Sequence, residues 1–155
     1  KDLVKRGAET FNWMLEYAKP TGLNIIVENH GRASSDPDVL VALVKAVNNP
    51  KFGLLVDLGN WNPGADRYAN SRKILPYHKG LSVKGTYGPD TDPGFDMVKL
   101  MKVALDFGYT GYWGIEVTPR RQRGQKISTP DLLAMEEKTI NEVKALIQQT
   151  VPGAV

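Results

Sequence analysis

The chain has 155 residues, 41% of them hydrophobic and 24% charged, a composition typical of one soluble globular domain. Its net charge of +3 is small and its basic residues are scattered, so the totals do not indicate a nucleic-acid partner. No apolar run reaches the roughly 20 residues of a membrane span, and the lack of cysteine excludes disulfides and thiolate metal sites.

The first half of the chain predicts two helices, each followed by a strand. An apolar stripe that stops before Pro20 predicts the first helix, and Ser35-Asp36-Pro37 is a strong start signal for the second. Short apolar runs that end in a carboxylate predict the strands. The expected elements are a helix over residues 2–18, a strand over 23–28, a helix over 37–47 and a strand over 52–57.

The second half repeats this alternation. A helix over residues 66–75 leads to a short strand over 80–84 and a polar loop over 85–94. A helix over 96–107, with Gly108 as a left-handed cap, leads to a strand over 112–117. A basic loop around 120–126, expected to be solvated or else to bind an anion, precedes a final helix over 128–149.

The strand ends recur at Glu28, Asp57, Lys84 and Glu116, at intervals of 29, 27 and 32 residues, which is the length of a strand plus a returning helix. One face of these strands is bulky and apolar, while the other is small at the base and charged at the top. A barrel interior tolerates that second face, whereas a doubly wound sheet does not. We therefore predict an α/β fold of the (β/α) TIM-barrel type.

Only four of the eight units of a barrel are present, so residues 1–155 are predicted to form half a barrel as a single domain. Because Lys1 does not look like a natural beginning, we expect a missing N-terminal segment to supply the other half; two copies closing one barrel is the alternative. A cytoplasmic location is expected, with export left open because a signal peptide would already be absent.

Several polar residues are expected to meet at the carboxyl-end rim of the sheet. Glu28, Asp57 and Glu116 come from three of the four strand ends, and such crowded carboxylates repel one another unless a cation lies between them. A hard divalent ion with oxygen ligands, Mg²⁺ or Mn²⁺, is the simplest candidate. The alternative is that strands often end in polar residues by chance.

The strand-end motifs, Glu-Asn-His, Val-Asp-Leu-Gly-Asn, Ser-Val-Lys and Gly-Ile-Glu in chain order, resemble those of the xylose isomerase-like TIM barrels over strands five to eight. In the tagatose epimerase branch, Glu, Asp, His and Glu hold a divalent metal, and the two glutamates move protons. The resemblance implies Glu28, Asp57 and Glu116 as metal ligands, with Glu28 and Glu116 as the acid/base pair. Ser82 occupies the position of the family's histidine and is a poorer ligand.

Five residues near the rim are candidates for binding substrate. His30, Asn60 and Trp61 suit a sugar, although His30 and Trp61 are also good packing residues. Arg32 suits an anionic group or simply solvent, and Lys84 suits charge neutralisation, substrate binding or a Schiff base. His78 precedes its strand and is expected to be structural.

These features predict a divalent-metal-dependent isomerase or epimerase that transfers a proton alpha to a carbonyl of a sugar or polyol. A lyase like inosose dehydratase would begin with the same proton abstraction. A degenerate sugar-binding module is the non-catalytic alternative. An activity like that of endonuclease IV is disfavoured, because its zinc site needs many histidines and this chain has two.

Overall fold

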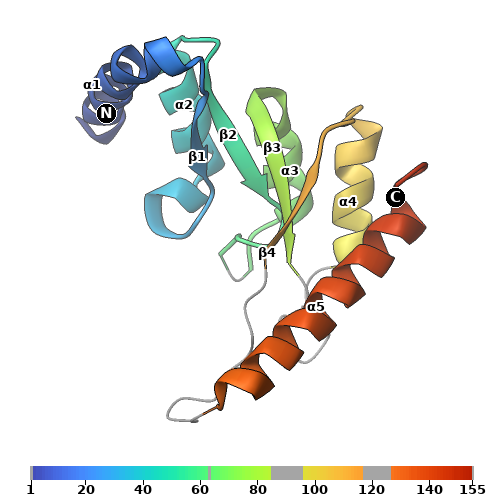
Figure 1. Cartoon of the computed structure of the whole chain (residues 1–155). Helices are drawn as coiled ribbons and strands as arrows, with labels where there is room; N and C mark the ends of the chain where they lie inside the picture. Colours follow the sequence, from blue (N-terminus) through green and yellow to red (C-terminus); the bar gives the residue numbers. More distant parts are fainter. Residues whose placement is uncertain (1, 63, 85–95, 117–126, 155) are drawn as a thin grey trace.

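Four parallel strands form one sheet in the order β1-β2-β3-β4, so each strand lies beside its neighbour in the sequence (Figure 1). The computed structural model describes residues 2–62, 64–84, 96–116 and 127–154. The strands are β1 (Ile25–Glu28), β2 (Phe52–Asp57), β3 (His78–Lys84) and β4 (Trp113–Glu116). The helices are α1 (Asp2–Ala18), α2 (Pro37–Val47), α3 (Arg67–Ile74), α4 (Met97–Asp106) and α5 (Thr129–Thr150), with short 3-10 turns η1 (Lys19–Thr21), η2 (Arg32–Ser35) and η3 (Leu75–Tyr77). The predicted α/β alternation is confirmed.

Capping side chains explain where the helices begin. Asp36 accepts hydrogen bonds from the backbone N–H groups of the second and third residues of α2, at 2.8 and 3.3 Å. Asp66, Asp96 and Ser128 cap α3, α4 and α5 in the same way. Each of these helices therefore begins within one residue of its predicted start.

The strands differ from the predictions at their ends. β1 begins at Ile25, whose backbone N–H donates to the carbonyl oxygen of Lys51 just before β2, and not at residue 23. β3 begins at His78, two residues earlier than predicted, because His78 already pairs with Leu54. Residue 117 and the predicted loops at 85–94 and 120–126 lie outside the described residues.

One face of the sheet carries the main hydrophobic core, as the strand pattern predicts. Leu54, Val56, Leu81 and Val83 are at most 1% exposed and pack with apolar residues of α2, α4 and α5. Each such burial contributes about 1.5–3 kcal/mol to folding. Successive helices also contact one another in chain order, from α1 to α5. The core thus fixes the strands whose ends carry the polar residues.

The opposite face of the sheet is more open. Ile26 is 45% exposed and Gly114 is exposed, whereas Asp57, Ser82 and Lys84 at the carboxyl end are buried. Gly53 is small for a reason, since a Cβ there would lie 2.8 Å from the backbone oxygen of Tyr77. This face is small at its base and polar at its carboxyl end, as predicted.

Among the helices described, none combines the length and the apolar character that crossing a membrane requires.

Candidate active site

Three carboxylates meet at the carboxyl end of the sheet. Glu28, Asp57 and Glu116 are the last residues of β1, β2 and β4, and one oxygen from each lies within 4.8 Å of the others. Asp57 is fully buried, and its Oδ1 accepts a 2.7 Å hydrogen bond from the backbone N–H of Gly59. Parallel register causes this convergence, because strands that run the same way end at the same edge.

Lys84 ends β3 and brings a positive charge among these carboxylates. Its Nζ lies 3.2 Å from Asp57 Oδ2 and also forms an ion pair with Glu116 Oε1. The Lys84 side chain is 4% exposed, and Lys84 pairs directly with Glu116 in the sheet register. Of the roles predicted for Lys84, charge neutralisation is the one that this geometry provides.

The surroundings shift the pKa values of Asp57, Glu116 and Lys84. Burial raises the pKa of Asp57 to about 6, although Lys84 and the hydrogen bond from Gly59 oppose that rise. Burial alone would raise the pKa of Glu116, but the hydrogen bond and charge of Lys84 outweigh it and lower this pKa. Burial alone would lower the pKa of Lys84, but Glu116 and Asp57 outweigh it and raise this pKa. A Schiff-base lysine needs the opposite shift.

Of the predicted substrate-binding residues, Asn60, His30 and Arg32 are not part of the hydrophobic core, whereas Trp61 is. Asn60 lies at the carboxylates, since its Nδ2 donates a 2.7 Å hydrogen bond to Glu28 Oε1. His30 is exposed and lies two residues after the end of β1. Arg32 is exposed at the start of η2, and its backbone is in the left-handed region with φ of 50°. Asn60 is thus in contact with the rim, while His30 and Arg32 follow the rim end of β1 along the chain.

Trp61 and His78 take structural positions. The Trp61 ring is 5% exposed in the main core, and its Nε1 donates a 3.1 Å hydrogen bond to Ser71 Oγ. This placement favours the packing alternative for Trp61. His78 contacts the Leu75 carbonyl through Nδ1 at 2.7 Å and packs edge-on against Tyr109, in the structural role expected of it.

Ser82 lies opposite Asp57 in the register of β2 and β3, and it is 6% exposed. Ser82 is therefore the direct neighbour of Asp57 on the adjacent strand. The family resemblance implies a histidine at this position. A hydroxyl is shorter than an imidazole and is a weaker metal ligand. Ser82 thus lies beside the carboxylates but does not supply a strong fourth metal ligand.

Sequence reasoning missed three buried polar residues that hold the loops of the site. Asn29 is fully buried and bonds to the backbone of Asp57 on the next strand. Arg67 is 6% exposed, and its Nη1 donates to the carbonyl oxygens of Gly59 and Trp61 at 2.9 and 3.2 Å. Ser35 Oγ accepts from the backbone N–H of Gly31 and donates to the carbonyl of Asn60.

The signal for Asn29 was available, because an amide directly after a strand that ends in a carboxylate is well placed to bond the neighbouring strand. Arg67 gave no comparable signal, since an arginine in a helix is usually solvated.

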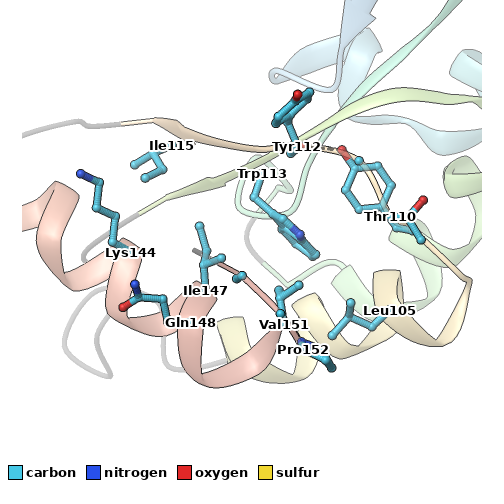
Figure 2. Close-up of a pocket in the computed structure, with 14 residues that line it drawn as sticks. Leu105, Thr110, Tyr112, Trp113, Ile115, Lys144, Ile147, Gln148, Val151 and Pro152 are labelled. Atoms are coloured by element: carbon cyan, nitrogen blue, oxygen red, sulfur yellow. Dashed lines mark hydrogen bonds between the residues drawn. The ribbon is translucent and has the colours of Figure 1, made fainter.

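A separate cavity of about 800 Å³ lies between β4 and the C-terminal part of α5 (Figure 2). Trp113 and Ile115 line it from the helix-facing side of β4, and Lys144, Ile147 and Gln148 line it from α5 (Figure 2). The carboxylates project from the other parity of the strands. This cavity is therefore distinct from the carboxylate site.

Comparison with protein families matches residues 2–149 to the model described as xylose isomerase-like TIM barrel. This match covers nearly the whole chain and confirms the resemblance carried by the strand-end motifs. The search of curated proteins finds no significant match.

Proposed function

The chain belongs to the xylose isomerase-like TIM barrel family, and from this premise we propose that it is an isomerase or epimerase of a sugar or polyol. The reaction is a proton transfer at a carbon next to a carbonyl group. The observation that supports this most is the convergence of Glu28, Asp57 and Glu116 within 4.8 Å, with the Lys84 ammonium against two of them. Such a reaction needs a positioned base and a positive group for the oxygen that becomes negative.

In the proposed step, one glutamate removes the proton and the other returns one. Glu28 takes the proton from the alpha carbon, the C–H electron pair becomes the new C=C bond, and the carbonyl oxygen gains the negative charge. Glu116 enters the step protonated and delivers that proton to carbon from another direction, which inverts the centre and leaves Glu116 ionised and Glu28 protonated; exchange with solvent then resets both carboxyl groups. The lowered pKa of Glu116 favours the carboxylate that it becomes once it has given up its proton.

The three carboxylates Glu28, Asp57 and Glu116 have the donor type that Mg²⁺ or Mn²⁺ prefers, but the Lys84 ammonium lies against two of them. A bound ion would stabilise negative charge on the substrate oxygen. Lys84 would have to leave Asp57 and Glu116 for the ion to use both of them.

Around the carboxylates, three polar side chains suit the hydroxyl groups of a sugar or polyol. The Asn60 Nδ2 group donates to Glu28, and the side-chain amide oxygen of Asn60 is an acceptor suited to a sugar hydroxyl. His30 and Arg32 are exposed in the segment that follows β1. We propose that Asn60 and His30 contact the substrate and that Arg32 receives an anionic group when one is present.

We also propose that the described unit corresponds to strands five to eight of a barrel. Among the described strands, β1 and β4 each pair on one side, and the face carrying Ile26 and Gly114 is open. A closed barrel needs eight strands. Four further units, from a preceding segment or a second copy of the chain, would cover this face and complete the rim.

The test is hydrogen exchange at the alpha carbon, followed by proton NMR in D₂O with a panel of 2-keto sugars and keto polyols. The native chain should incorporate deuterium into at least one of them, and Glu28→Gln and Glu116→Gln should abolish the incorporation. Glu9→Gln, an exposed change on α1, is the matched control and should exchange like the native chain. Binding of these compounds without any exchange would instead support the sugar-binding module.

A further inference from the structure

Lys84 occupies the place between two carboxylates that a metal ion would need. Its ammonium contacts Asp57 Oδ2 at 3.2 Å and pairs with Glu116 Oε1, while the side chain is 4% exposed. The residue ends β3, between the strands that carry these two acids. The position of the ammonium is therefore set by the pairing of β3 with its neighbouring strands and not by a loop.

We infer that Lys84 is the resident cation of this site, with its ammonium in the position of a divalent metal between Asp57 and Glu116. The catalytic part of this inference rests on the proposed function, since it assigns the Lys84 ammonium to stabilise the substrate oxygen. The structural part, that Lys84 keeps a divalent ion out, does not depend on any reaction.

Two independent features support the structural part. A divalent ion bound by Asp57 and Glu116 would lie close to the Lys84 ammonium, and the two positive charges would repel strongly in a buried setting. The metal would also lack the imidazole of the family's ligand set, because Ser82 stands in that position and offers a weaker oxygen. Strand β3 thus places the Lys84 ammonium at the site, and the same strand has Ser82 where the family has a histidine ligand.

Moving Lys84 aside is unfavourable for a physical reason. With the side chain almost completely buried, an ammonium separated from Asp57 and Glu116 would be a buried charge without its partners. Asp57 is also fully buried, so it would lose the partner that offsets its own burial. A metal ion must compensate both losses before it gains any affinity.

The chemistry follows from the donors of the ammonium. A lysine has three N–H donors, and the Lys84 ammonium forms ion pairs with two carboxylates, Asp57 and Glu116. Its remaining N–H capacity can donate to the carbonyl oxygen of a keto sugar or keto polyol. When Glu28 takes the alpha proton, the electron pair of the C–H bond forms the C=C bond and the oxygen becomes negative beside the ammonium. No redox change occurs, and the proton returned to carbon balances the one removed.

The experiment is a calorimetric titration of Mn²⁺ into the native chain, Glu28→Gln, Lys84→Met and Lys79→Met. Lys79 is an exposed lysine on the same strand and serves as the matched control. We expect Lys84→Met to bind Mn²⁺ at least about tenfold more tightly than the native chain, because two carboxylates become available as ligands. Lys79→Met should bind as the native chain does.

Two results would overturn the inference. One is tight Mn²⁺ binding by the native chain that Glu28→Gln removes, which would place a metal at the carboxylates despite Lys84. The other is a folded Lys84→Met chain, judged by circular dichroism, that binds no more tightly than the native one. If Lys84→Met does not fold, the native titration still decides the question, and Lys84→Arg provides a second folded variant that should exclude Mn²⁺ as the native chain does.

Failure of the proposed function gives a different pattern. Native chain in excess chelator should exchange the alpha hydrogen of its keto substrate, and Lys84→Met should lose that exchange by about a hundredfold. Absence of exchange by the native chain, with and without Mn²⁺, would overturn the catalytic role. The Mn²⁺ affinities would still decide whether Lys84 holds the cation position.

Discussion

The side-chain amide of Asn29 forms two hydrogen bonds with the backbone of Asp57. Asn29 Nδ2 donates to the Asp57 carbonyl oxygen, the Asp57 N–H donates to Asn29 Oδ1, and both distances are 2.8 Å. Asn29 is fully buried and follows directly after Glu28. One side chain thus ties the end of β1 to the end of β2 and sets the spacing between two of the three carboxylates.

Replacing Asn29 with alanine should lower the free energy of unfolding by about 2–4 kcal/mol, because a buried N–H and a buried carbonyl both lose their partners. Urea denaturation measures this change. Asn12→Ala, an exposed asparagine on α1, is the control and should change stability by less than about 0.5 kcal/mol. Equal stability of the two variants would contradict a tie between the strands.

Asn60 provides a test of how Glu28 is oriented. Its Nδ2 donates a 2.7 Å hydrogen bond to Glu28 Oε1, and hydrogen bonds to charged groups contribute about 1.5–3 kcal/mol. Asn60→Ala should therefore slow alpha-hydrogen exchange by roughly tenfold or more. Asn62→Ala, an exposed change in the same loop, should leave the exchange rate as it is. An unchanged rate in Asn60→Ala would show that Glu28 does not depend on this contact.

The pKa of Asp57 predicts a pH dependence of stability in chelator-treated protein. Burial raises this pKa from 3.8 to about 6, so the folded chain holds the proton more tightly than the unfolded chain does. The stability that this group contributes is fully present below about pH 4 and is lost as pH rises through about 6. The Asp57→Asn variant has no carboxyl group at this position, so its stability does not include this contribution.

The stability of the native chain minus that of Asp57→Asn should therefore fall between pH 4 and pH 6, by on the order of 2–3 kcal/mol. Urea denaturation at a series of pH values measures both curves. A difference that rises with pH over this interval would mean that Lys84 outweighs the burial of Asp57.

Restoring the family's histidine tests the two features of β3 separately. Ser82→His alone should leave Mn²⁺ affinity within about threefold of the native value, because Lys84 still contacts Asp57 and Glu116. Ser82→His combined with Lys84→Met should bind about tenfold more tightly than Lys84→Met alone, since an imidazole joins the carboxylates. Calorimetry measures all four chains. Tight binding by Ser82→His alone would show that the missing imidazole, and not the ammonium, limits the metal.

The sequence was sufficient to predict the βα alternation and the convergence of the strand ends. Glu28, Asp57 and Glu116 could be found because each ends an apolar run, and the spacing of those runs requires parallel strands. Parallel strands must place their last residues on one edge. The charge of Lys84 was expected at the same rim for the same reason.

The partners of individual side chains could not be predicted in the same way. Asn60 and Trp61 are adjacent in one loop, yet Asn60 bonds to Glu28 and Trp61 lies in the core. Arg67 is buried beneath that loop and bonds to its carbonyl oxygens, which decides how the loop is held. Such choices depend on the three-dimensional path of a loop, and neither periodicity nor spacing encodes it.

The most direct measurement is a crystal structure of the native chain grown with millimolar MnCl₂, with data collected at the manganese absorption edge. We predict no anomalous peak among Glu28, Asp57 and Glu116, and continuous density for Lys84 up to Asp57 and Glu116. An anomalous peak coordinated by these carboxylates, with Lys84 turned away from them, would contradict it.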